Sequence, residues 1–257
     1  MLTSSIQKIQ QKLLNRKPFS ELIPVLDYFP DKRLFLVDPA GLGFFIICEP
    51  SPGVSSGLRQ TLRSIYTLNY PADTTVNTSL VANRDLVSQM NNWRSVRYNR
   101  MSFMDRQFEN DIVDIMDAYH GESISEGCRY PSRIYMRNLE VWHSVCVPTK
   151  KQNPTKKEAE KVQSLLRETL SRLQAEGMNP RIANHNDWIR RMQVIFNSGN
   201  KSAWHKGPTS ARPTVPLREQ ILEFGRNVSM TKSGLATHGS IASRKDENRE
   251  IRVLNCY

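Results

Sequence analysis

An apolar strand that leads into a capped amphipathic helix constrains the fold of this chain more than any other stretch. The predicted strand, residues 134–147, carries apolar side chains on both faces: Val141, Val145 and Val147 on one, Trp142 and Cys146 on the other. After a polar break, Thr155 and Glu158 have the spacing of a capping box. Gly177 lies where a helix would end on a residue in the left-handed backbone conformation. Between them apolar residues recur at helical spacing: Ala159, Val162, Leu165, Leu166, Leu170 and Leu173. With a further apolar segment at Pro180 to Ala183, the pattern predicts strand, helix, strand.

The first half of the chain predicts a hairpin, a helix and a third strand. Two apolar runs, 34–37 and 44–48, flank a turn in which Pro39 presets φ and Gly41 and Gly43 supply positive φ. The second run is apolar on both faces, so we expect a central strand. Ser55 or Ser56 can cap a helix whose apolar side is Leu58, Leu62, Ile65 and Tyr66, and β-branched residues predict a strand at Thr74 to Val81.

Three further helices are expected. Asp85 is a candidate N-cap for a helix through Trp93, and a second helix carries the apolar stripe Phe108, Ile112, Ile115, Met116 and Tyr119. After a connector at 121–131 and the strand and helix described first, a third helix capped by Asn186 contains Trp188, Ile189, Met192, Ile195 and Phe196.

These elements predict an α+β fold: two strand-helix units, of the ferredoxin-like or split βαβ kind, packed together with mainly antiparallel or mixed sheets. The expected divisions are an N-terminal basic amphipathic helix (1–18), a first α+β unit (19–130), a second strand-helix unit (131–197), a linker or long loop (198–217) and a strand pair (218–257). The pair comprises Asn227–Lys232 and Ile251–Cys256, separated by a polar stretch. Because chains seldom end inside a packing element, we expect this hairpin to belong to a longer protein.

Composition narrows the class of partner. Thirty-six Lys and Arg against 25 Asp and Glu give a net charge of +11, which favours nucleic acid, anionic lipid or an acidic protein surface. The four cysteines are far apart and indicate a reducing cytoplasm. No secretory signal is visible, and the longest apolar run, Phe44 to Cys48, is too short to cross a bilayer, so membrane contact is expected to be peripheral or through a partner.

No catalytic, cofactor-binding or metal-ligating residue is predicted. Gly199 to Ser202 lacks the glycines of a phosphate loop, and His143 and Cys146 point to opposite faces of a strand. Asp111, Asp114 and Asp117 recur every third residue, but the simpler interpretation is a solvated helix face.

Two basic segments are the candidate contact sites. Arg94, Arg97 and Arg100 alternate with aromatic residues, as in proteins that bind single-stranded nucleic acid, although Trp93 fits an ordinary apolar stripe better. Lys8, Lys12, Arg16 and Lys17 surround a short apolar face that could meet a membrane or a partner; the simpler alternative is a terminal helix docked on the domain.

Several strings resemble the N-terminal region of TraC-type conjugation ATPases, the assembly ATPases of type IV secretion systems. They are Phe19-Ser20-Glu21-Leu22-Ile23-Pro24 with Asp27-Tyr28, the hairpin from Arg33-Leu34-Phe35 to Gly43-Phe44-Phe45, and the unit from Tyr135-Met136-Arg137 through Pro148 and Lys150-Lys151 to Leu173. The resemblance runs from about Phe19 to the end and rests on hydrophobic patterns rather than catalytic signatures.

The resemblance implies a non-catalytic assembly and docking domain in conjugative transfer and pilus assembly. ATP and Mg²⁺ would act only on a motor domain that is absent from these residues, so no cofactor is expected here. The implied partners are further copies of the chain, in a hexamer, and inner-membrane secretion subunits. The implied location is cytoplasmic, at the inner face of the bacterial inner membrane, with the membrane reached through partners. A basic nucleic-acid-binding module and a peripheral membrane-binding domain are the alternatives.

Overall fold

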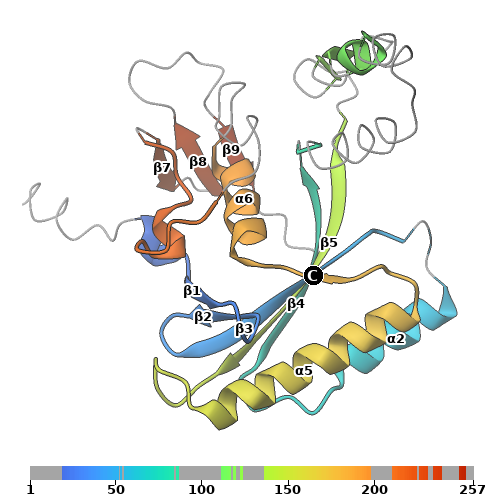
Figure 1. Cartoon of the computed structure of the whole chain (residues 1–257), viewed down its shortest axis with the longest axis vertical. Helices are drawn as coiled ribbons and strands as arrows, with labels where there is room; N and C mark the ends of the chain where they lie inside the picture. Colours follow the sequence, from blue (N-terminus) through green and yellow to red (C-terminus); the bar gives the residue numbers. More distant parts are fainter. Residues whose placement is uncertain are drawn as a thin grey trace, which may run out of the picture.

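The described part of the chain in this computed structural model comprises residues 19–51, 53, 55–83, 85–86, 111–116, 118–119, 122–123, 136–197, 210–224, 226–230, 234–238 and 249–252. Its elements in chain order are η1 (Phe19–Leu22), β1 (Val25–Phe29), β2 (Leu34–Val37), β3 (Gly41–Cys48), α2 (Ser56–Tyr66), β4 (Thr75–Asn83), β5 (Asn138–Pro148), α5 (Lys156–Ala175), β6 (Arg181–Ile182), α6 (His185–Phe196), η3 (Leu217–Glu219), β7 (Asn227–Met230), β8 (Gly234–His238) and β9 (Arg249–Arg252). The fold is α+β, as the sequence predicts (Figure 1).

One six-stranded sheet contains strands from both predicted strand-helix units. β5 lies between β3 and β4, and β6 pairs with β3, so the order β6-β3-β5-β4 is antiparallel throughout. The chain order β3-α2-β4-β5-α5-β6 with this strand order is the ferredoxin-like βαββαβ arrangement. The β1–β2 hairpin extends the sheet on the β3 side, and residues 84–137 connect β4 to β5.

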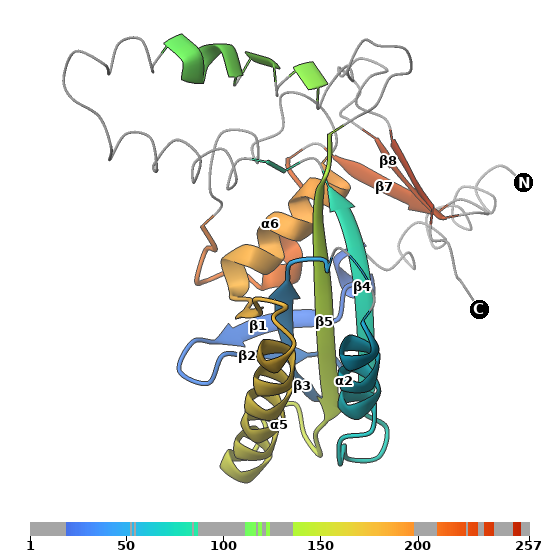
Figure 2. The same cartoon turned by 90° about the vertical axis from the view of Figure 1, so that its right-hand side faces the viewer.

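Helices cover both faces of this sheet, but different halves of it. In Figure 2, α2 and α5 lie against one face, toward one end of β4 and β5, while α6 lies on the opposite face toward the other end. Under α2 and α5 the core contains the buried residues Leu34, Leu42, Phe44, Ile46, Cys48, Leu58, Ile65, Val145, Val147, Ala159, Val162, Leu165, Leu166, Leu173 and Met178. Under α6, η1 and η3 it contains Val25, Phe35, Ile47, Trp142, Ala183, Trp188, Ile189, Phe196, Leu217 and Ile221. The prediction that β5 is covered on both faces is therefore confirmed.

The helix boundaries follow local capping chemistry. Thr155 and Glu158 form the predicted capping box of α5, and Gly177 has the expected positive φ of 69°. Ser55 caps α2 by accepting a hydrogen bond from Leu58 N at 2.9 Å. The cap of α6 is Asn184 rather than the predicted Asn186, because Asn184 exchanges hydrogen bonds with Asp187 in a second capping box.

Three other local predictions were wrong. Gly41 and Gly43 begin β3 without positive φ; at Gly43 a Cβ would lie 2.8 Å from the carbonyl oxygen of Val145, so close strand approach is what requires glycine. β5 begins at Asn138, after Met136 and Arg137, which lie outside the strand. In the helical stretch 111–116, Val113 is buried whereas Ile115 of the predicted stripe is 67% exposed.

The C-terminal region forms a separate three-stranded antiparallel sheet in the order β7-β8-β9. β8 falls inside the stretch that was expected to be a polar separator, so the predicted strand pair has a third member. The part of the predicted loop at 210–216 is held by Gln220, whose side chain bonds the backbone of Arg212 and Val215. None of the described helices is long and apolar enough to cross a membrane.

Candidate functional site

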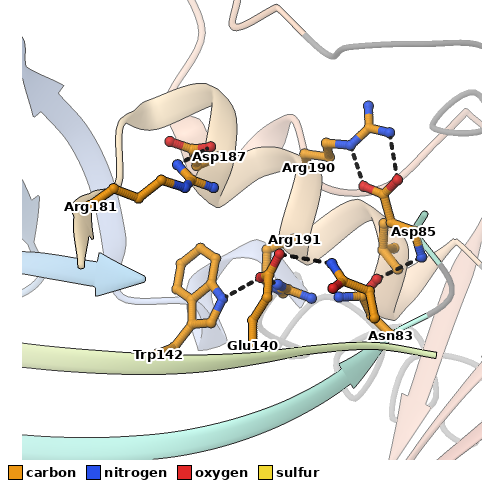
Figure 3. A pocket seen from close by; sticks show the side chains of 10 residues that line it. Asn83, Asp85, Glu140, Trp142, Arg181, Asp187, Arg190 and Arg191 are labelled. Carbon is orange, nitrogen blue, oxygen red and sulfur yellow. Dashed lines mark hydrogen bonds and ion pairs between the residues drawn. The ribbon is translucent and has the colours of Figure 1, made fainter. Parts of the chain in front are cut away.

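A small polar pocket lies between α6 and the ends of β4 and β5 (Figure 3). Its lining residues are Asn83, Asp85, Asn138, Glu140, Trp142, Arg181, Asp187, Arg190, Arg191 and Val194. The cavity has a volume of about 50 Å³, which is room for about one or two water molecules. Six of the ten lining residues have ionisable side chains: Asp85, Glu140, Arg181, Asp187, Arg190 and Arg191.

Arg191 is the centre of this cluster. Its side chain is buried, pairs with the carboxylate of Glu140, and places the guanidinium carbon 4.9 Å from the centroid of the Trp142 ring. Glu140 also accepts hydrogen bonds from Trp142 Nε1 at 2.8 Å and Asn138 Nδ2 at 2.9 Å. Burial lowers the pKa of Arg191 to about 10, so the guanidinium remains a cation at neutral pH.

Two further ion pairs complete the cluster. Arg190 binds Asp85 through two nitrogen–oxygen contacts, one of them 2.8 Å long, and joins α6 to the residues that follow β4. Arg181 Nη1 lies 2.9 Å from Asp187 Oδ1, while Oδ2 of the same carboxylate accepts from the backbone N–H of Asn184. Three carboxylates thus meet three guanidinium groups.

Each of the three carboxylates therefore accepts hydrogen bonds within the cluster. The chemistry of the cluster is attachment: it fastens α6 to β5 and to the end of β4. Breaking the pair of Arg191 on one side only is costly, because the remaining charge is largely removed from water without its partner.

A second buried polar group lies on the opposite face of β5. His143 Nδ1 is 2.9 Å from Thr78 Oγ1, which is in turn 2.6 Å from the hydroxyl of Tyr66 on α2. Burial lowers the pKa of His143 to about 4, so the ring is neutral at physiological pH.

The two described cysteines are also enclosed. Burial raises the pKa of Cys146, and it raises the pKa of Cys48 to about 11, so both thiols stay protonated and are poor nucleophiles.

A larger open pocket of about 400 Å³ lies beside the start of α5. Its lining combines apolar groups with two lysines and the capping carboxylate: Pro71, Val147, Pro148, Thr149, Lys150, Glu158, Lys161 and Val162. Hydrogen bonds from the Thr155 hydroxyl and from the backbone N–H groups of Lys150 and Thr155 lower the pKa of Glu158 to about 2. Glu158 is therefore occupied in holding the β5–α5 turn.

The predicted contact residues lie outside the described part of the chain: Arg94, Arg97, Arg100, Lys8, Lys12, Arg16 and Lys17. Asp111 and Asp114 are exposed, as predicted for a solvated helix face, and Asp117 lies outside the described residues. No group of three or more His, Cys, Asp or Glu in the described residues could hold a metal ion.

Sequence reasoning missed the cluster around Arg191. Asp85 was considered only as a helix cap, and its pairing with Arg190, which lies 105 positions away, was not foreseen; the helix that it was expected to cap lies outside the described residues. The available signal was a charged residue between Trp188, Ile189 and Met192 on the apolar side of α6, which indicates a buried cation in need of a carboxylate.

No curated protein matches the chain. The family described as TraC protein does match, over residues 19–256, which include β1–β9, α2, α5 and α6. The match begins at Phe19, where the strings that resemble TraC-type proteins also begin, and it extends through the C-terminal sheet. The chain therefore belongs to the TraC protein family and is a protein related to conjugation and type IV secretion.

Proposed function

We propose that this chain is a non-catalytic assembly and docking region of its conjugation or type IV secretion apparatus. It would associate with further copies of itself and with inner-membrane secretion subunits, at the cytoplasmic face of that membrane. The proposal rests on where the charged and the uncharged side chains of the described residues lie. The ionisable groups that gather in the polar pocket are paired with one another, whereas uncharged strand surface at β4 and β5 is exposed.

The buried chemistry supports a structural role. Asp85, Glu140 and Asp187 are held by arginines, His143 is neutral and enclosed, and the thiols of Cys48 and Cys146 are protonated. Proton transfer and nucleophilic attack need a group of matched pKa beside a space that admits substrate. The polar pocket, with a volume of about 50 Å³, is too small for a nucleotide.

ATP and Mg²⁺ accordingly have no part in this proposal for the chain itself. They are expected to act on the motor domain that the resemblance to TraC-type ATPases implies. Docking needs a stable scaffold, which the core on both faces of the six-stranded sheet can supply.

Cell fractionation tests the docking role. The chain is expressed in bacteria with and without the other subunits of its transfer apparatus, and inner membranes are separated from the remaining cell contents. We expect the chain in the inner-membrane fraction only when the other subunits are present, since no described helix crosses a membrane. The same distribution in both hosts would contradict docking on those subunits.

A further inference from the structure

We propose that the outer edge of β4 is where a second copy of this chain docks, with the two β4 strands pairing antiparallel about a two-fold axis. The inference rests on the assembly role proposed above and names the surface that serves it.

β4 is the terminal strand of the six-stranded sheet. Its nine residues, Thr75–Asn83, pair with β5 without a shift in register, from Thr75 opposite Cys146 to Asn83 opposite Asn138. No described strand pairs with the other side of β4. One row of its backbone N–H and C=O groups therefore faces outward along about 30 Å, ready to pair with another strand.

The composition of β4 is unusual for such an edge. Edge strands are normally protected from pairing by charged residues, proline or a bulge, and β4 has none of these. Leu80 is 67% exposed, and Leu139, which lies opposite Ala82 on β5, is 46% exposed. Alternation along the strands places Leu80, Ala82, Leu139 and Val141 on the face that α2 covers farther along. The edge therefore combines free backbone groups with an apolar flank.

Charge and symmetry favour a second copy as the occupant. The chain carries a net charge of +11, so two copies repel each other on average, whereas β4 is uncharged over its whole length and adds nothing to that repulsion. Antiparallel pairing of a strand with itself is a two-fold, self-complementary contact. If Leu80 lies opposite its own copy, residues 77–83 pair with each other and the exposed leucines of both copies form one patch.

The proposed contact between the two β4 strands is small. Seven paired residues span about 23 Å, and with their apolar flank they bury less than the roughly 800 Å² per partner of a standard stable interface. We therefore expect a weak dimer, with a Kd on the order of 10–100 μM, that larger assemblies strengthen through several such contacts.

Sedimentation velocity of the full chain from about 1 to 200 μM tests the proposal. The wild type should shift from monomer to dimer over this range, and Leu80→Lys should raise the Kd at least tenfold by placing two cations together. Leu22→Lys is the matched control, because Leu22 is 53% exposed in η1, outside the proposed contact. Circular dichroism establishes that both variants are folded.

Cross-linking gives a second readout. Under mild oxidation Leu80→Cys should form a covalent dimer, since opposed residues of paired strands lie within disulfide reach, whereas Leu22→Cys should not. A wild type that is monomeric throughout, or a dimer that Leu80→Lys leaves unchanged, would overturn the inference. If the chain is monomeric but still requires the other subunits for membrane fractionation, only this contact fails; if it dimerises but fractionates independently of them, the docking role fails.

Discussion

At the scale of single residues, burial determines the protonation state of His143. The ring lies in β5 against Tyr66 and Thr78, and its Nε2 finds no hydrogen-bond partner in the described part of the chain. The neutral tautomer with its proton on Nδ1 donates to Thr78 and leaves Nε2 unprotonated, so no buried donor is left without an acceptor. Protonation would place an uncompensated charge in the core under α2.

His143 should therefore make stability depend on pH. Its pKa is about 4 in the folded chain, below the ordinary value of 6.5, so the unfolded chain binds more protons between these limits. The stabilisation is present above pH 6.5 and is lost as the pH falls toward 4, by up to about 3 kcal/mol. Urea unfolding at pH 7.0 and 5.0 measures the loss.

The matched variant is His143→Phe, which keeps an aromatic ring beside Tyr66 and does not titrate. We expect its free energy of unfolding to fall less than that of the wild type between these pH values. An equal fall in both proteins would assign the pH dependence to other groups.

At the scale of elements, the sequence specifies those whose signals are local. α5 could be predicted because its cap, its apolar stripe and Gly177 all lie within the helix or next to it. The α6 cap was misplaced because Asn184 and Asn186 offer the same side chain two positions apart. β8 was missed because a short strand is defined by its neighbours, here β7 and β9, more than by its own composition.

The attachment of α6 also depends on residues that are distant in sequence, and this makes a prediction about Arg191. Arg191→Leu should leave the partly buried Glu140 without its cation and lower the free energy of unfolding by about 3 kcal/mol, measured by urea denaturation at pH 7.

The double variant Arg191→Leu with Glu140→Gln removes both charges and keeps one of the two acceptor oxygens that Trp142 Nε1 and Asn138 Nδ2 use. It should recover most of the lost stability. Failure to recover it would mean that packing of the arginine against Trp142, rather than charge pairing, attaches α6.

At the scale of the whole molecule, strand order was the information that the sequence could not supply. The predicted strand-helix units are consecutive in the chain, yet β5 of the second lies between β3 and β4 of the first. This order depends on contacts between segments separated by residues 84–137, and local patterns do not encode them. The exposed edge of β4, on which assembly is proposed to depend, follows directly from that order.

Phosphate release from ATP by the purified chain, measured with Mg²⁺ at neutral pH, tests the central claim that these residues supply surfaces for assembly rather than groups for catalysis. We expect a rate no higher than that of a heat-denatured sample of the same preparation. Sustained turnover proportional to the concentration of the folded chain would contradict the claim.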